Sequence, residues 1–307
     1  MILFKKFYFK IIFLTLLKLN FLKMNLEEKQ KKCSDWFRSL RDGICFEFEK
    51  IEEEFDKKYP GKFERKNWNR HENSRPDSDG GYGEISIMKG NVFEKVGVNF
   101  SEVYGEFSPE FRNEIPGAKE DPRFWASGIS LVAHMKSPLV PAIHLNTRFI
   151  CTQKTWFGGG TDLNPSIENA QDTIDFHASL KKACDSSDPT YYEKYKKWCD
   201  EYFFIKHRNV ARGVGGIFYD YLNTENFEND FEFTKNIGLA FLDIYPKIVR
   251  RHMSKKFTEQ QRELQLKKRG LYAEFNLVYD RGTRFGLMTG GNVEAILMSL
   301  PPIAKWE

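Results

Sequence analysis

The chain has few of the features that mark a disulfide-stabilised, membrane-spanning or nucleic-acid-binding protein. Its 307 residues include only five cysteines, an odd number without a CxxC pair. This argues against a disulfide framework or a zinc site and favours a reducing, cytoplasmic compartment. Within the first 23 residues the longest uncharged apolar run covers residues 11–17, which is too short to span a bilayer. A formal charge of +4, without a basic run interleaved with aromatic residues, argues against nucleic acid as a partner.

The first 23 residues differ from the rest of the chain. They carry lysines at positions 5, 6, 10, 18 and 23 and no acidic residue. Two interpretations stay open: a basic segment that contacts a membrane surface, or sequence upstream of a true start at Met24. The second is favoured because an amphipathic helix begins immediately after Met24. We therefore divide the chain into an N-terminal extension, 1–23, and one folded domain, 24–307.

The pattern of the remaining residues predicts an α+β fold. Apolar residues recur every three or four positions from Cys33 to Phe55, as on one face of a helix, and a polar loop follows over 59–83. We expect strands at 84–88, 92–100, 128–134 and 143–151, helices at 168–183, 190–208 and 231–254, and a second strand pair at 271–279 and 284–289, joined by a turn at 280–282. The order lacks regular βαβ alternation, so we predict a single domain with a large, mostly antiparallel sheet.

The strand IHLNTRFIC, residues 143–151, alternates between apolar and polar side chains. His144, Asn146 and Arg148 share one face, and Thr147 belongs to the opposite, apolar face. Histidine can move a proton near neutral pH, and arginine can clamp a carboxylate through two parallel hydrogen bonds. If the preceding strand pairs with this one, its Ser130 and His134 line the same pocket. Periodicity alone equally allows a solvated sheet face.

The segment WFGGGTDLNP, residues 156–165, combines three glycines with Asp162. Glycines let the backbone turn sharply or approach a ligand, and Asp162 would present its carboxylate at the tip of this loop. The alternative is an aspartate that serves as a turn or cap residue. The glycines lack the Gly-Lys-Ser/Thr ending of a phosphate-binding loop, which excludes that class.

Basic residues and glycines crowd the end of KKWCDEYFFIKHRNVARGVGGIFYD, residues 196–220. His207, Arg208 and Arg212 precede a Gly-Val-Gly-Gly turn, as expected where cations approach an anionic ligand or another subunit. The four histidines at 134, 144, 177 and 207 raise the question of a metal, but neither a facial-triad signature nor HExxH is present. His71 and His252 are interpreted as surface residues.

Several long segments, taken in order, resemble the oxygen-dependent coproporphyrinogen-III oxidases. They are VFEKVGVNFSEVYGE, GISLVAH, PAIHLNTRF, WFGGGTDLNP, KKWCDEYFFIKHR, RGVGGIFYD, EFNLVYDRGTRFGL and TGGNVEAILMSLPP. The resemblance runs from about residue 84 to the C-terminus and more loosely back to about 25. It implies an antiparallel sheet covered on both faces by helices and a homodimer formed through residues 272–307, with His207 at the interface. It also implies molecular oxygen as co-substrate, with no required metal or organic cofactor.

The resemblance also assigns roles to individual residues. It implies that His144 is the proton donor, that Asp162 accepts pyrrole N–H groups and that Arg148 binds a propionate. Further substrate contacts would come from Ser130, Asn146, Thr147, Gly290, Gly291 and Asn292. The alternative metal site would consist of His134, His144, His177 and His207, binding a divalent ion. Asn292 departs from the family, in which many members carry arginine, and Arg281 or Arg284 could take over its role.

The implied reaction is the oxidative decarboxylation of two propionates of coproporphyrinogen III to vinyls, which gives protoporphyrinogen IX in haem biosynthesis. An electron-rich pyrrole can react with oxygen directly, so no cofactor is required for the electron transfer. Two other functions stay open from the sequence. The histidines could hold iron or copper in a metal-dependent oxygenase, or the chain could be a non-catalytic porphyrin-binding protein.

Overall fold

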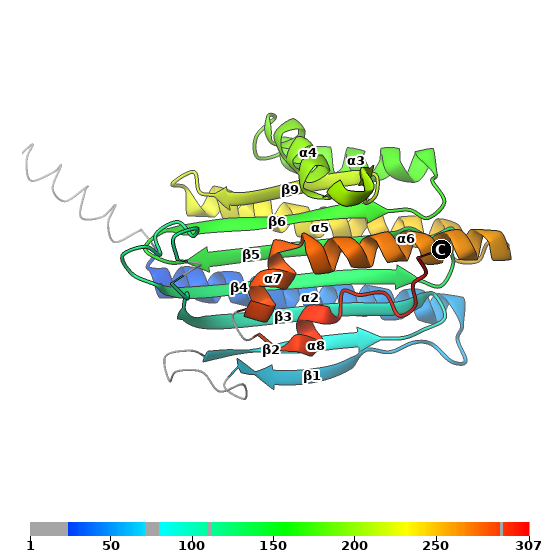
Figure 1. Ribbon diagram of the computed structural model, residues 1–307, viewed down its shortest axis with the longest axis horizontal. Helices are drawn as coiled ribbons and strands as arrows, with labels where there is room; N and C mark the ends of the chain where they lie inside the picture. The colour runs from blue at the N-terminus through cyan, green and yellow to red at the C-terminus, as the bar shows by residue number, and fades with distance from the viewer. Residues whose placement is uncertain (1–23, 71–79, 110–111, 289–290, 307) are drawn as a thin grey trace, which may run out of the picture.

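The centre of the protein is a seven-stranded, wholly antiparallel sheet, seen in a computed structural model that describes residues 24–70, 80–109, 112–288 and 291–306 (Figure 1). The strand order is β1-β2-β3-β4-β5-β6-β9. These strands are β1 Glu64–Asn69, β2 Gly80–Met88, β3 Phe93–Glu106, β4 Arg123–Met135, β5 Ala142–Cys151, β6 Thr155–Asn164 and β9 Gly215–Leu222. The predicted α+β class and antiparallel sheet are therefore confirmed.

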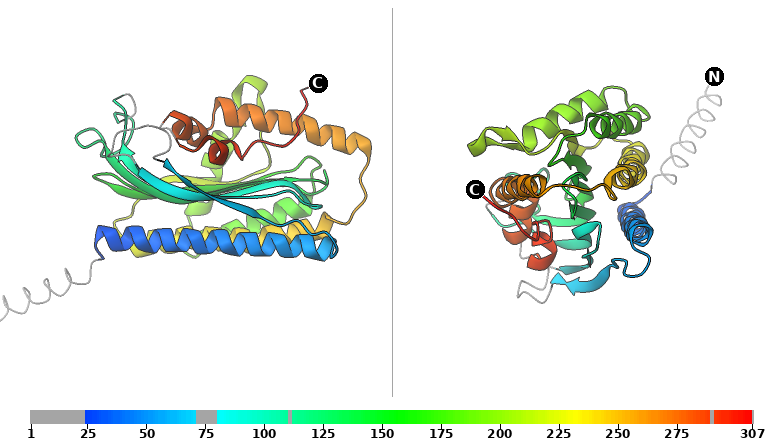
Figure 2. Two further views of the ribbon diagram at one scale, coloured as in Figure 1. Left: turned by 90° about the horizontal axis from the view of Figure 1, so that it is seen from below. Right: turned by 90° about the vertical axis from the view of Figure 1, so that its right-hand side faces the viewer.

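Helices cover both faces of this sheet. The described residues form α2 Leu26–Phe55, α3 Ala170–Asp185, α4 Tyr191–Tyr202, α5 Phe227–His252, α6 Glu259–Val278, α7 Arg281–Met288 and α8 Val293–Leu297. Figure 2 shows α2 and α5 on one face and α6, α7 and α8 on the other. A short ribbon of β7 Phe204–Ile205 and β8 Val210–Ala211 flanks a 3₁₀ turn at Lys206–Arg208.

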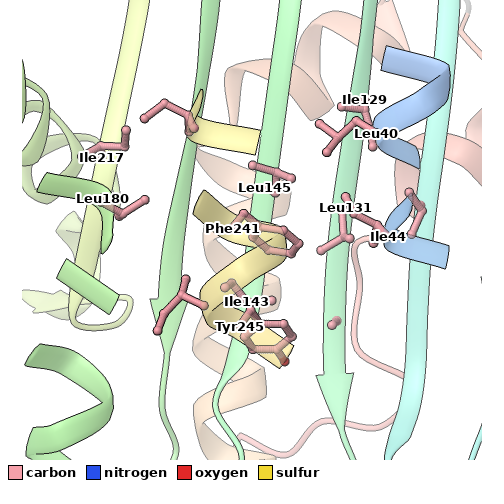
Figure 3. Packing of buried hydrophobic residues seen from close by; sticks show 14 of the residues in the cluster. Leu40, Ile44, Ile129, Leu131, Ile143, Leu145, Leu180, Ile217, Phe241 and Tyr245 are labelled. Atoms are coloured by element: carbon pink, nitrogen blue, oxygen red, sulfur yellow. The ribbon is translucent and has the colours of Figure 1, made fainter. Parts of the chain in front are cut away.

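The main hydrophobic core lies between the sheet and the α2–α5 layer (Figure 3). Leu40 and Ile44 come from α2, and Phe241 and Tyr245 come from α5, because each helix turns an apolar stripe inward. The strands supply alternate residues such as Leu131 and Leu145. The packing fixes which face of each strand is buried, and so determines which side chains remain for the opposite face.

Two segments differ from the sequence prediction. The expected strand pair at 271–279 and 284–289 is wrong, because residues 271–278 belong to α6 and residues 281–288 to α7; Thr289 lies outside the described residues. The expected loop at 59–83 contains β1 and the start of β2, although residues 71–79, with His71, lie outside the described residues.

Three local predictions also need correction. The glycine-rich segment forms β6 instead of a loop, so Asp162 lies within a strand. The helix expected over 190–208 ends at Tyr202, and His207 lies in the 3₁₀ turn. His252 is buried and bonded to Asp172 at 2.7 Å, so it is no surface residue.

All five cysteines are free and buried. In the part of the chain that the structure describes, no helix has both the length and the apolar character needed to cross a membrane.

Candidate active site

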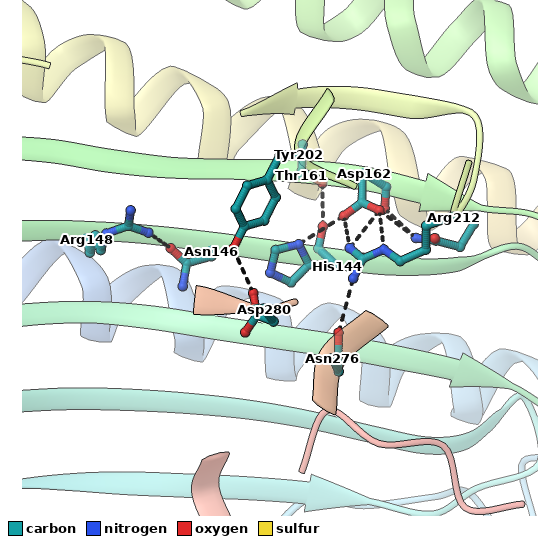
Figure 4. Close-up of polar contacts among 10 residues, drawn as sticks. His144, Asn146, Arg148, Thr161, Asp162, Tyr202, Arg212, Asn276 and Asp280 are labelled. Carbon is teal, nitrogen blue, oxygen red and sulfur yellow. Dashed lines mark hydrogen bonds and ion pairs between the residues drawn. The ribbon is translucent and has the colours of Figure 1, made fainter. Parts of the chain in front are cut away.

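Strand β5 places His144, Asn146 and Arg148 on the sheet face beneath α6 and α7, which we call the site face (Figure 4). Along β5 every second residue is buried, so the predicted alternation is confirmed. Ser130 on β4 lies opposite Asn146 in the register, and residues directly opposite share a face. The register therefore places Ser130 on the face of His144 and Arg148, whereas His134, predicted to line the same pocket, is buried against the Ser299 carbonyl. Thr147 is fully buried on the opposite face, so its side chain is not presented to a substrate on the site face.

His144 and Asp162 form the centre of the site. They lie opposite each other on β5 and β6, and Nδ1 of His144 is 3.0 Å from Oδ1 of Asp162. Since an ionised carboxylate only accepts, Nδ1 carries the hydrogen and donates it to Asp162. Among the described residues, none is hydrogen-bonded to the other ring nitrogen, Nε2. His144 is therefore oriented by Asp162 with Nε2 available for a proton.

Arg212 completes this arrangement from the loop before β9. Its Nη2 lies 2.6 Å and 2.8 Å from the two carboxylate oxygens of Asp162, and its Nε lies 3.1 Å from Oδ2. The guanidinium packs among the rings of Phe203, Tyr272 and Phe275, at 4.0 to 4.7 Å from their centroids. A cation between aromatic faces is attracted by the ring quadrupoles, which partly offsets its loss of hydration.

The electrostatics keep Asp162 ionised. Its burial alone would raise the pKa, but the charge of Arg212 and the hydrogen bond from His144 outweigh burial and lower the pKa to about 2. The side chain is 1% exposed, and its oxygens already accept from Arg212, His144 and Asn164. In this conformation Asp162 has no free position for a pyrrole N–H. The geometry instead makes it the hydrogen-bond acceptor that orients the His144 ring.

Arg148 lies 2 residues along β5 from Asn146 and is held on two sides. Nη1 donates to Oδ1 of Asn146 at 2.8 Å, and Nη2 is 2.8 Å from Oδ2 of Asp220 on β9. Gly158 of β6 lies between Arg148 and Asp220, and a Cβ at this position would come within 2.9 Å of the Arg148 guanidinium. Glycine is needed here because the arginine crosses the neighbouring strand at the level of the backbone.

The other three histidines each have partners of their own. His134 bonds through Nε2 to the carbonyl of Ser299 at 2.9 Å, and burial lowers its pKa to about 3. His177 contacts the Val214 carbonyl and the Tyr192 hydroxyl. Within the described residues, no group of three or more His, Cys, Asp or Glu side chains is placed to hold a metal ion. The structure thus does not bring the four histidines together.

His207 lies outside the site, against the end of α6. Its two ring nitrogens contact Glu274 at 2.6 Å and the hydroxyl of Tyr279 at 2.8 Å. The side chain is 39% exposed, so one side of the ring faces away from these partners.

The expected substrate-binding turn at 290–292 is only partly described, because Gly290 lies outside the described residues. The N–H of Gly291 donates to the carbonyl of Gly286 at 2.8 Å. Asn292 is the N-cap of α8, and its side chain accepts from the N–H of Ala295 at 2.9 Å. Asparagine is a preferred cap residue, so a local structural role explains its presence.

Sequence reasoning missed several groups of the site. Arg212 stood out only as one cation of a cluster, although its RGVGG context places it directly before a strand. Asp220 gave no signal, because the residue alternation of a strand that begins with glycines is hard to follow. Tyr202, which donates to Asp280 at 3.0 Å and stacks on Phe218, falls within the helix predicted over 190–208, and the pattern gives no sign of a site role.

Comparison with known proteins gives a single family. The family model described as coproporphyrinogen III oxidase matches residues 32–307. Among curated proteins, the oxygen-dependent coproporphyrinogen-III oxidase of Rickettsia bellii is 59% identical over 283 residues, which cover 91% of this chain and 99% of that protein. The protein of the same description from Rickettsia conorii is 59% identical over 287 residues, covering 92% of this chain and all of the relative.

Proposed function

The chain belongs to the coproporphyrinogen III oxidase family, and on that premise we propose how its residues carry out the reaction. It is an oxidoreductase of haem biosynthesis that uses oxygen to convert two propionates of coproporphyrinogen III into vinyls. In each conversion one propionate loses carbon dioxide, a proton and two electrons, and oxygen accepts the electrons. The protein must therefore bind anionic propionates and move protons beside an electron-rich pyrrole.

His144 handles the proton. Its Nε2 has no hydrogen-bond partner among the described residues, while Nδ1 is fixed by Asp162. When Nε2 takes up a proton, the ring becomes a cation, and the ionised carboxylate 3.0 Å away stabilises it. This orientation by a buried carboxylate is the single observation that carries the proposal, because a histidine that only packs needs no such partner.

Arg148 binds one propionate on the site face. One of its five N–H groups donates to Asn146 and its Nη2 is paired with Asp220, so N–H groups remain for a carboxylate. Ser130 and Asn146 flank it on the same face. Gly158, opposite Arg148 on β6, leaves room for the guanidinium to lie over this strand beside Asp220.

We propose that the electron transfer to oxygen requires no metal and no organic cofactor, because a reduced pyrrole is electron-rich enough to react with oxygen. The experiment is oxygen uptake with freshly reduced coproporphyrinogen III, with and without a strong chelator. Uptake that the chelator abolishes and one metal restores would instead support a metal-dependent oxygenase. Folded protein that binds the tetrapyrrole without oxygen uptake would be a porphyrin-binding protein.

The role of His144 is tested by His144→Asn. The Asn amide can replace Nδ1 as the donor to Asp162 but has no counterpart of Nε2. We expect turnover per folded molecule to fall by roughly 10²- to 10⁴-fold, the range for loss of a general acid–base group. Unchanged turnover in a stable His144→Asn enzyme would show that this histidine moves no proton.

We also propose a cytoplasmic homodimer formed through residues 272–307. Apolar side chains are exposed at the end of α6 and on the two helices that follow, including Leu277 at 59%, Val278 at 61% and Val293 at 53%. Exposed apolar patches of this kind mark protein contacts. Leu277→Asp should convert the dimer to monomer in sedimentation experiments, whereas Ile174→Asp, equally exposed on α3, should not. Five free cysteines fit a reducing compartment.

A further inference from the structure

Arg148 is the half-buried cation to which we assign a propionate, yet it already has a carboxylate beside it. Oδ2 of Asp220 lies 2.8 Å from Nη2 of Arg148, and the exposed fractions of the two side chains are 9% and 26%. An ion pair at this depth is screened less by solvent and salt than a surface pair. A propionate that binds Arg148 therefore meets a guanidinium whose charge is largely balanced.

The position of the Asp220 carboxylate is closely determined. Its Oδ1 accepts from the backbone N–H of Tyr221 at 3.0 Å, while Oδ2 faces Arg148. Tyr221 has a φ of 55°, a left-handed conformation that is uncommon for a bulky residue. A Cβ on Gly158 would lie 2.6 Å from Oδ1 of Asp220. A strained residue on one side and an absent side chain on the other thus leave space for this carboxylate beside Arg148.

We propose that Asp220 is a positioning residue, which aims the Arg148 guanidinium at the substrate and weakens its hold on a carboxylate. The inference rests on the proposed role of Arg148 as a propionate-binding residue. Asp220 acts as a built-in carboxylate that occupies one side of the guanidinium, and Asn146 fixes a second position.

The chemistry of the reaction gives this arrangement a purpose. A carboxylate that is to leave as carbon dioxide must be bound in one orientation but not so tightly that its loss of charge is penalised. An unpaired half-buried arginine would favour the charged propionate over the transition state in which that charge moves away, and such ground-state binding does not increase turnover. Asp220 offsets this preference while it keeps the guanidinium fixed.

Two substitutions separate these two effects. Asp220→Asn removes the charge but keeps an oxygen that can accept from Arg148. We expect it to bind coproporphyrinogen III roughly three- to tenfold more tightly in anaerobic titrations, where no turnover occurs. Asp220→Ala also removes the acceptor, so Arg148 is free to move, and we expect kcat to fall about tenfold or more without weaker binding.

The matched control is Asp243→Asn, which removes the same charge from an exposed pair with Lys247. It should leave binding and turnover unchanged. In an Arg148→Gln background, Asp220→Asn should no longer tighten binding, because the effect passes through Arg148. Asp220→Glu keeps the charge and should leave affinity close to that of the unmodified enzyme.

Different failures point to different steps. If Asp220→Asn binds no more tightly than Asp243→Asn, or binds more weakly, the inference about Asp220 is wrong while the enzyme activity stands. If Arg148→Gln binds as tightly as the unmodified enzyme, the propionate role of Arg148 is wrong, and the inference falls with it. An unmodified protein that shows no oxygen uptake with coproporphyrinogen III would overturn the proposed function itself.

Discussion

Asp162→Asn is expected to lower the free energy of unfolding by about 3–5 kcal/mol, the cost of removing one partner from a buried ion pair. The substitution keeps the shape of the side chain but leaves the Arg212 guanidinium, which is 2% exposed, without a counter-charge. The rings of Phe203, Tyr272 and Phe275 attract that cation but cannot accept its hydrogen bonds as a carboxylate does.

The lowered pKa of Asp162 gives a second, smaller value for what this carboxylate contributes to the free energy of unfolding. A shift from 3.8 to about 2 corresponds to about 2 kcal/mol of stability. Because the folded-state pKa is the lower one, this contribution is fully present above about pH 4 and is lost as the pH falls toward 2. The pKa shift is a net effect, because burial of the carboxylate opposes the favourable interactions with Arg212 and His144. The free energy calculated from it is therefore smaller than the cost of leaving Arg212 without its partner.

Equilibrium denaturation in urea at neutral pH, followed by tryptophan fluorescence, measures the loss. The decisive comparison is the double variant Asp162→Asn, Arg212→Met, in which a flexible apolar side chain replaces the cation between the rings. It should recover most of the lost stability but none of the turnover, because His144 still lacks its charged partner. A loss below 1 kcal/mol in Asp162→Asn, or a double variant no more stable than the single one, would refute the unpaired-cation reasoning.

Three further predictions concern stability and the arginine clamp, by which we mean Arg148 held by Asn146 and Asp220. Glu52→Ala should lower the free energy of unfolding by about 3 kcal/mol or more, because the fully buried carboxylate accepts backbone N–H groups of the turn before β3 at 2.7 to 2.8 Å. Glu53→Ala, on the exposed side of α2, is the control and should lower it by under about 0.5 kcal/mol in the same urea titration. His134→Gln should make the free energy of unfolding less dependent on pH below about pH 6.5. Because burial lowers the pKa of His134 to about 3 in the folded state, neutral His134 contributes stability above pH 6.5. This stability is lost as the pH falls, at up to about 1.4 kcal/mol per pH unit. Gly158→Ala should displace the Arg148 guanidinium and reduce turnover at least as much as loss of the Asp220 acceptor; unaltered kinetics would show that the clamp tolerates the extra methyl group.

The sequence predicts the central strands well because one face of each is buried. Along 143–149 apolar and polar residues alternate with Thr147 as the one polar member of the apolar set, and the structure buries that set. The prediction fails at 271–279, where Phe275, Val278 and Tyr279 have high strand propensity but lie in or just after a helix. Tyr272, Phe275 and Tyr279 recur at helical spacing, and burial of the first two against Arg212 overrides local preference.

The site could be predicted only in part for a related reason. The polar row of β5 is visible in the sequence, but its partners come from residues far along the chain, such as Arg212 and Asp220, and their pairing depends on the order of the strands. The sequence draws attention to the Asp162 carboxylate, but its glycine-rich surroundings predict a loop, whereas it lies within β6. The glycines are instead explained by close contact within the sheet: a Cβ on Gly159 would meet the Tyr219 hydroxyl at 2.9 Å.

Helix α6 connects the site to the surface proposed for dimer formation. Asn276 accepts from Nη1 of Arg212 at 3.2 Å, and Phe275 packs on the same guanidinium. The next two residues, Leu277 and Val278, are exposed on the other side of the helix. A partner that buries these two side chains would restrict the motion of α6 and hence the position of Arg212. If the dimer forms there, the monomeric Leu277→Asp enzyme should also turn over more slowly, although the side chain of residue 277 is largely exposed on the surface of α6. Full turnover in the monomer would show that Asp162 and Arg212 hold their geometry without help from this surface.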